Sequence, residues 1–226
     1  HIEMTLNLSA TDVGLGLGQM SFSRNNVSWS EEEAYAATKA WTFGPGDGSR
    51  KIYVKFMDKA GRWSSAVSVA VTLDTAKPEG LININLSASY TTSQTVTLNL
   101  SAKDSGGVAT MSFSSDNVNW STPEAYAVSK TFTISTGDGN KTVYVKYYDK
   151  AGNESAVYSK SIVLDTQPPQ GTVKVNGGVL YINQSTVRLD LAAEDAGLGV
   201  SKMSFSANGT AWTAAETYAA SKAWTF

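Results

Sequence analysis

The amino-acid sequence predicts an all-β fold built from tandem antiparallel β-sandwich modules. Two observations carry this prediction: a long internal repeat and a two-residue hydrophobic period within each copy. A Met-Ser-Phe-Ser segment occurs at residues 20–23, 111–114 and 203–206, each time followed by the same order of aromatic residues. The copies lie about 91 residues apart. Solenoid repeats span only ~20–50 residues and an immunoglobulin-like (Ig-like) sandwich ~100, so we expect one Ig-like module per copy.

Polar segments containing Pro and Gly separate the modules. The Leu-Asp-Thr stretch at 73–80 returns at 164–171, with the composition of a linker. We predict module 1 at residues 1–77 without its first strand, a complete module 2 at 78–168, and module 3 at 169–226 without its last strands. Two explanations of the incomplete third module stay open. It is either an ordinary boundary within a longer polypeptide or a fold completed by another chain through strand addition.

Within a module, apolar and polar residues alternate as in half-buried strands. The alternating runs are residues 4–10, 52–56, 67–73, 96–102 and 143–147. Gly-Asp-Gly and Asp-Lys-Ala-Gly turns separate them, because Gly and Asp tolerate positive φ. Residues 31–39 and 123–130 are the only stretches expected to form a helical turn.

Composition excludes several classes of protein. The chain has no Cys, so it cannot contain disulfides or thiolate metal sites, and each module must be held together by its core. The net charge of −2 gives no basic field for nucleic acid, so no nucleic-acid partner is expected. No apolar run approaches the ~18 residues of a membrane span, which predicts no membrane insertion in this segment.

The turn and strand motifs together resemble a known group of repeats. Residues 51–61 and 143–153 are similar to the closing strands of tandem Ig-like or fibronectin type III-like repeats of large prokaryotic extracellular or cell-surface proteins. Nearly the whole chain matches that pattern, but Arg62 stands where the second module has Asn153. The resemblance implies extracellular or cell-surface spacer or adhesive modules, and it names no ligand because such folds host many functions.

The residues give little support for catalysis. The only histidine is His1, so neither a Ser/His/Asp triad nor a histidine metal site can form within a module. Recurring acids such as Asp58 and Asp149 lie in turns, where Asp ordinarily bonds backbone amides. We predict that the chain is not an enzyme and has no catalytic residues or organic cofactor.

Calcium is the one cofactor that the sequence leaves open. Structural calcium suits linkers where two modules meet, and the candidate ligands are Asp12, Asp74, Asp104 and Asp165. Turn formation is the alternative role for these residues, because no dense Asp-x-Asp-x-Asp loop is present.

Aromatic residues provide the second candidate site. A Trp that recurs beside the Met-x-Phe strand is expected to fill the space between two sheets. This reasoning assigns six residues to the core: Trp29, Trp41, Trp120, Phe132, Trp212 and Trp224. Trp63 has Glu154 in its place in the second module, so it is the better candidate for an exposed ring that binds a ligand such as polysaccharide.

Nine of the 13 Asn residues stand in an Asn-x-Ser/Thr frame. The glycosylation candidates are Asn26, Asn119, Asn140, Asn153 and Asn208. The alternative is that Ser and Thr are simply abundant on water-facing strand positions.

Together these observations predict a non-catalytic structural spacer or stalk module of an extracellular or cell-surface protein or filament. Its partners would be neighbouring modules of the same longer chain or other copies of it. The alternative is a carbohydrate-binding or adhesive module of a secreted hydrolase or adhesin. Exposed rings in a row would favour binding, and Trp buried between sheets would favour spacing.

Overall fold

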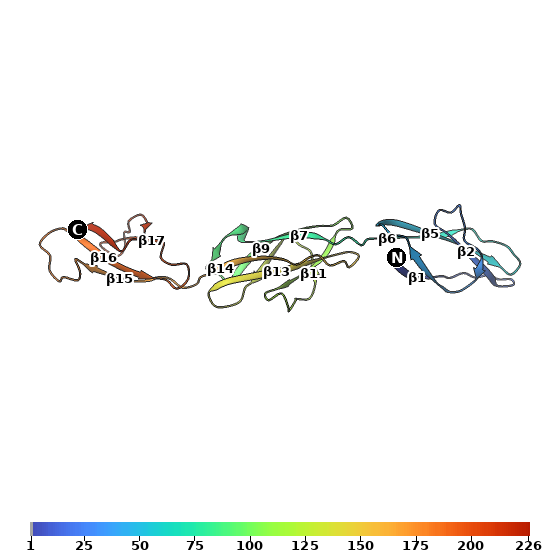
Figure 1. Cartoon of the computed structure of the whole chain (residues 1–226), viewed down its shortest axis with the longest axis horizontal. Helices are drawn as coiled ribbons and strands as arrows, with labels where there is room; N and C mark the ends of the chain where they lie inside the picture. Colours follow the sequence, from blue (N-terminus) through green and yellow to red (C-terminus); the bar gives the residue numbers. More distant parts are fainter. Residues whose placement is uncertain (1) are drawn as a thin grey trace. The chain divides into compact units, whose positions relative to one another are not determined.

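A computed structural model describes residues 2–226, and these residues form β-strands joined by turns and loops (Figure 1). They contain no α-helix, and their single helical element is a 3-10 turn at Asn85–Ser87. Within the same residues no helix has the length and apolarity that a membrane span requires.

The chain divides into two compact units. The first extends to Glu79 and includes two later segments, Ala102–Thr110 and Tyr147–Ala156. The second comprises Gly80–Ser101, Met111–Lys146 and Val157–Phe226. The first unit therefore contains the loop after one strand of the following repeat and the turn at the end of another.

The strands of the first repeat form two antiparallel sheets. They are β1 (Ile2–Asn7), β2 (Leu17–Ser23), β3 (Glu33–Ala34), β4 (Thr38–Phe43), β5 (Gly48–Asp58) and β6 (Val67–Leu73). One sheet has the order β3-β2-β5-β6, and β1 pairs with β4 in the other. Opposite Phe56 and Val54 of β5 lie Met20 and Phe22, so alternate side chains of both strands reach the core.

Residues 79–164 form a complete sandwich. The strands are β7 (Glu79–Ile84), β8 (Tyr90–Thr91), β9 (Thr95–Lys103), β10 (Val108–Ser114), β11 (Glu124–Ala125), β12 (Ser129–Thr133), β13 (Gly139–Asp149) and β14 (Tyr158–Leu164). One sheet has the order β12-β9-β7, and the other has the order β11-β10-β13-β14-β8 with β8 parallel to β14. This strand order is that of an Ig-like sandwich. Its core includes Leu98, Val143, Val145 and Tyr147, all without solvent exposure.

The last repeat has five strands, β15 (Gln170–Val175), β16 (Thr186–Glu194), β17 (Lys202–Met203), β18 (Glu216–Thr217) and β19 (Ser221–Thr225). β15, β16 and β19 form one antiparallel sheet, and β17 pairs only with β18. Val187 and Leu189 are buried in this region, whereas Met203 and Phe205 are only half-buried.

The predicted all-β fold and the alternating strands are confirmed, but the predicted helical turns are wrong. Residues 31–39 contain β3 and the start of β4, and residues 123–130 contain β11 and the start of β12. In the first of these stretches Ala34 pairs with Gln19 of β2. The cross-strand hydrogen bonds override the local helical preference of the Glu and Ala residues.

Candidate metal centre at the first linker

Each linker is held by the Gly-Asp-Gly turn that precedes it. The Oδ1 atom of Asp47 accepts hydrogen bonds from the backbone N and the Oγ1 of Thr75, at 3.0 and 2.8 Å. Asp138 accepts the same two bonds from Thr166 at the same distances. We call these two contacts the threonine clamps. Their recurrence gives the central Asp of each Gly-Asp-Gly turn a defined structural task.

Three carboxylates from three segments of the first compact unit converge beside the linker. Asp74 directly follows β6, Asp104 directly follows β9, and Asp149 is the last residue of β13. One oxygen from each lies within 4.8 Å of the other two. Asp149 is buried, and the other two are half-buried. We call Asp74, Asp104 and Asp149 the acidic cluster.

The close approach of Asp74 to the loop after β9 depends on glycine. A Cβ added at Gly106 would overlap the Oδ2 atom of Asp74. The backbone N of Gly106 in turn donates a 2.7 Å hydrogen bond to the Oδ1 of Asp104. A larger residue at 106 would therefore displace one carboxylate of the acidic cluster.

Asn153 joins the linker to the turn after β13. Its Nδ2 donates to the backbone O of Asp74 at 3.0 Å and to the Oδ2 of Asp149 at 2.7 Å. Its backbone N donates to the Oδ1 of Asp149 at 2.9 Å. A single amide side chain thus fixes both the linker backbone and the buried carboxylate.

Two carboxyl groups of the acidic cluster, those of Asp74 and Asp149, have opposite pKa shifts. Burial raises the pKa of Asp74, and the neighbouring Asp104, Asp149 and Asp47 carboxylates raise it further, against one hydrogen bond from Ala76. Burial also acts to raise the pKa of Asp149, but hydrogen bonds from Asn153 and the turn amides outweigh it and the pKa falls. The hydrogen bonds therefore favour the charged form of Asp149, whereas burial and, after it, repulsion disfavour the charge on Asp74.

This donor set suits a hard divalent cation. All three side chains offer carboxylate oxygens, which Ca²⁺ and Mg²⁺ prefer, and there is no thiolate or imidazole among them. Ca²⁺ tolerates irregular geometry and takes about six to eight oxygens, so carboxylates from three loops would be completed by water or backbone oxygens. A bound cation would also relieve the repulsion that acts on Asp74.

The structure brings two of the four predicted calcium ligands together, Asp74 and Asp104, and it places Asp12 in another role. The Oδ2 of Asp12 accepts hydrogen bonds from the backbone N of Gly14 and of Gly16, at 3.0 and 2.9 Å. Asp12 therefore closes its own loop, which is the turn-forming role that the sequence left open.

Asp165 repeats the position of Asp74 within the second compact unit. Its Oδ2 accepts a 2.9 Å hydrogen bond from the backbone N of Leu198, and a Cβ at Gly197 would overlap its carboxylate. Asp149 was missing from the predicted ligand set, although the Asp-Lys-Ala-Gly turn recurs at both strand ends. That recurrence does not single out Asp149, because Asp58 stands at the same place in the first repeat.

The corresponding turn of the first repeat contains a cation of its own. The Oδ1 of Asp58 accepts from the backbone N of Ala60 and of Arg62, and its Oδ2 accepts from the Arg62 Nε at 2.8 Å. The hydrogen bond from the Arg62 backbone, followed by that from its side chain, lowers the pKa of Asp58 although burial opposes the shift. A guanidinium here takes the place of the Asn153 amide.

Trp63 lies next to a lysine that also contacts Trp29. The Nζ of Lys55 is 4.2 Å from the ring centroid of Trp63 and 4.6 Å from that of Trp29. In the second repeat the Nζ of Lys146 is 4.5 Å from the Trp120 ring. These are cation–π contacts on the outer face of the sheet.

The predicted core role of Trp29, Trp120 and Trp212 is therefore wrong. The first two are half-buried under a lysine, and Trp212 is 63% exposed. The other three rings, Trp41, Phe132 and Trp224, are half-buried and pack on Phe22, Phe113 and Phe205 with centroids 5.6 to 5.9 Å apart. The Phe of the first two Met-Ser-Phe-Ser segments, Phe22 and Phe113, is buried in the core instead.

Four of the five glycosylation candidates, Asn26, Asn119, Asn140 and Asn208, are exposed, and Asn153 is half-buried. The Nδ2 atom, to which a glycan would be attached, is engaged in hydrogen bonds at Asn153 and donates to Asp116 at Asn119. A glycan replaces one of the two Nδ2 hydrogens, so modification of Asn153 would remove one of its two Nδ2 bonds, whereas Asn119 has a hydrogen to spare. His1, on which the argument against catalysis depended, lies outside the described residues.

No known protein family matches this chain, and no curated protein matches it. Among solved structures, the fibronectin(III)-like modules of CbhA from Clostridium thermocellum are similar to it at 16% identity. That similarity covers 72% of this chain and 85% of that chain, with a TM-score of 0.47. The Ig-like assignment rests on the strand order of residues 79–164.

Proposed function

We propose that the chain is a non-catalytic structural spacer of an extracellular or cell-surface protein or filament. The threonine clamps carry this proposal, because both linkers are fixed to the preceding turn by the same pair of hydrogen bonds. The residue before each clamped Thr also approaches a glycine of the following loop, at Gly106 and at Gly197. Linkers held at both ends restrict bending, which is what a spacer requires.

Distance distributions between spin labels test this proposal. Labels placed on residues 27 and 118, both at exposed Val positions, should give one narrow distribution in the native chain. Asp47→Ala removes the first clamp and should broaden it, whereas Asp138→Ala removes a clamp outside the labelled interval and should leave it unchanged. A broad distribution in the native chain would refute the spacer role.

We further propose that Ca²⁺ binds the acidic cluster and stiffens the first linker. Support comes from the convergence of three carboxylates, and burial, together with repulsion between the carboxylates, raises the pKa of Asp74. Calorimetric titration of metal-free chain with Ca²⁺ should show one site, which Asp104→Asn removes and Asp195→Asn leaves intact. Absence of heat and of a calcium-dependent thermal shift would reject calcium without affecting the test of the clamps.

A carbohydrate-binding or adhesive module is the second candidate. The half-buried Trp63 favours it, since a ring at the surface can stack on a sugar. Lys55 already lies against that ring, so a sugar would have to displace it. Titration with soluble polysaccharides should show no binding under the spacer proposal. Saturable binding that Trp63→Ala abolishes would favour the alternative.

A further inference from the structure

One loop conformation recurs at the end of each Met-Ser-Phe-Ser segment. In the last repeat, the Oδ1 of Asn208 accepts hydrogen bonds from the backbone N of Thr210 and of Ala211, each at 2.9 Å. The Oδ1 of Asn25 in the first repeat and that of Asp116 in the second accept the same two bonds at 2.8 Å. We call these segments the tip loops; they are residues 23–28, 114–119 and 206–211. The three copies therefore place different side chains on one backbone frame.

The residue after the central Asn or Asp has a positive φ in all three tip loops. Asn26, Asn117 and Gly209 have φ angles of 62°, 61° and 75°. The backbone N of each donates to the Oγ of the Ser that begins its loop, at 2.9, 2.9 and 2.8 Å. Of the three, only Gly209 has no Cβ. Its backbone N is therefore the one that a neighbouring carboxamide carbon can approach most closely.

The last tip loop holds the groups for a reaction within the chain. Attack of the Gly209 N on the Cγ of Asn208 forms an N–C bond and moves charge onto Oδ1. The two backbone N–H groups that already bond Oδ1 stabilise that charge, as donors in an oxyanion hole do. The Gly209 proton passes to the Oγ of Ser206, whose own hydroxyl proton is donated to the Asn208 Oδ1 at 3.1 Å. Loss of the Nδ2 group as ammonia leaves a succinimide ring, and solvent water opens the ring to aspartate or isoaspartate.

The second tip loop shows that an aspartate fits the central position. Besides its two backbone bonds, Asp116 accepts a 2.9 Å bond from the Ser114 Oγ and a 2.7 Å bond from the Asn119 Nδ2. The bond from the Asn119 side chain, followed by the backbone bonds, lowers the pKa of Asp116, so this loop favours a charged carboxylate. An aspartate at position 208 would meet the same pair of backbone donors.

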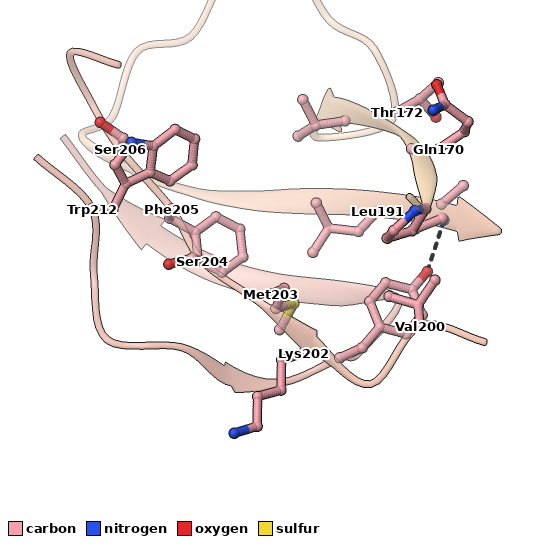
Figure 2. A pocket seen from close by; sticks show the side chains of 16 residues that line it. Gln170, Thr172, Leu191, Val200, Lys202, Met203, Ser204, Phe205, Ser206 and Trp212 are labelled. Atoms are coloured by element: carbon pink, nitrogen blue, oxygen red, sulfur yellow. Dashed lines mark hydrogen bonds between the residues drawn. The ribbon is translucent and has the colours of Figure 1, made fainter. Parts of the chain in front are cut away.

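We propose that Asn208 is a site of spontaneous deamidation, in which the Gly209 N displaces ammonia and water then produces aspartate at position 208. The change adds a negative charge to the last repeat and removes the Asn-x-Thr frame at 208–210. Ser206 and Trp212 flank the reacting residues, and both line the pocket that Figure 2 shows, so the new charge lies at the border of that pocket. This modification does not depend on the spacer role.

A second Asn-Gly pair, at residues 176–177, is bonded differently and provides an internal comparison. The Oδ1 of Asn176 accepts a 2.8 Å bond from the backbone N of Arg188, and the Gly177 N donates to the Oδ2 of Asp190 at 2.6 Å. Both residues of the pair are thus bonded to β16, not to the backbone that follows them. We therefore expect Asn176 to deamidate more slowly than Asn208.

Mass spectrometry of the whole chain, kept folded at mildly alkaline pH, tests the proposal. Exchange of ammonia for water changes the mass of the chain, and peptide mapping locates the modified residue. Asn208 should react first, about tenfold or more ahead of Asn25 and Asn176. Equal rates at Asn208 and Asn176 would show that the Asn-Gly sequence alone sets the rate and would overturn the proposal. An unchanged mass at Asn208 would also overturn it.

Exchanging residues between the first and last tip loops separates the two causes of the reaction. Gly209→Asn should slow deamidation at Asn208 to the rate of Asn25, and Asn26→Gly should accelerate it at Asn25. Both variants keep a residue type that already occupies this φ in a tip loop. Ser206→Ala removes the proton relay and should slow the reaction at Asn208 by about tenfold or more. A faster reaction in Ser206→Ala would show that loop mobility sets the rate and would contradict the proposed mechanism.

Discussion

Two turns of the molecule share the sequence Asp-Lys-Ala-Gly and differ in the residue that follows it. At the end of β5, Arg62 supplies both backbone and side-chain donors to Asp58, so the carboxylate is neutralised within its own turn. At the end of β13, Asn153 supplies neutral donors to Asp149 and also bonds the backbone of Asp74. In the first turn, Arg62 balances the charge of Asp58. In the second turn, Asp149 lies beside two more carboxylates.

One substitution thus separates a turn whose carboxylate is paired with an arginine from one whose carboxylate is bonded by a neutral amide. Arg62 places a positive charge 2.8 Å from its carboxylate. Asn153 supplies hydrogen bonds of similar length but no positive charge. The aspartates alone do not distinguish the two turns; the residue four positions after each of them does.

The largest effect is expected from Asp149→Asn, compared with Asp58→Asn. Asp149 is 3% exposed and accepts hydrogen bonds from Asn153 and from turn amides, so its replacement leaves buried donors facing an amide group. We expect a loss of about 2–3 kcal/mol. Asp58→Asn should cost less, because the Arg62 side chain is exposed and can bind water instead. Urea unfolding measures both losses.

Hydrogen exchange identifies where the effect acts. In Asp149→Asn the amides of residues 147–156 should exchange faster, while those of β5 keep their protection. Asp58→Asn should be the less destabilising of the two, because the second turn differs from the first by its bond to the linker. The opposite order of the two losses would contradict this difference between the turns.

A second large effect is expected when Asn153 is replaced by Arg. The guanidinium would lie beside Asp149, as Arg62 does beside Asp58, and its charge would take the place of the proposed calcium. The thermal shift that Ca²⁺ produces in the native chain should disappear. The reciprocal change, Arg62→Asn, should create no calcium response. The cavity beside Asp58 is lined by one other acidic side chain, that of Asp12, so two carboxylates would be available instead of three. A calcium response that survives in Asn153→Arg would contradict the proposed site.

The sequence alone predicted the all-β fold and its alternating strands, because both follow from the two-residue hydrophobic period. It did not place Asp149 with Asp74 and Asp104. Asp149 was assigned to its turn alone, because the bond from Asn153 to the Asp74 backbone joins residues 79 positions apart. No local pattern encodes a contact at that separation.

The aromatic residues show a second reason for failure. A Trp repeated in every module is equally compatible with a position between the two sheets and with a position on the outer face of one sheet. The recurrence of Trp alone does not distinguish these two positions. The structure places Trp29 opposite Ser23 and on the same outer face as Lys55, not with Phe22 in the core. The alternation of side chains along β5 was the available signal. Lys55 stands between the buried Val54 and Phe56, so its side chain points to the opposite, outer face.

A smaller effect is expected in the dependence of stability on pH, and its sign should be opposite for Asp58 of the first turn and Asp74 of the linker. The pKa of Asp58 is lowered by folding, so its stabilising contribution is present above the unfolded value of 3.8 and is lost as the pH falls through the lower folded value. The pKa of Asp74 is raised, so its penalty grows as the pH rises from 3.8 through the folded value.

In metal-free buffer at pH 7, Asp74→Asn should therefore melt at a higher temperature than the native chain and Asp58→Asn at a lower one. Both differences should shrink towards pH 3. Thermal unfolding between pH 3 and pH 7 in the presence of a chelator measures them. A lower melting temperature of Asp74→Asn at pH 7 would show that its hydrogen bonds outweigh the repulsion from the acidic cluster.

The smallest effect is expected from Trp63→Glu, which gives the first turn the residue that follows Asn153 in the second. Lys55 would lose one of its two ring contacts, worth about 0.5–1 kcal/mol, and a Lys–Glu pair at the surface would return part of it. A double-mutant cycle of Trp63→Leu with Lys55→Met isolates the coupling between ring and lysine, because neither change introduces a new charged partner. A coupling near zero would mean that the ring contributes by packing alone. The difference between the two turns would then reside entirely in Arg62 and Asn153.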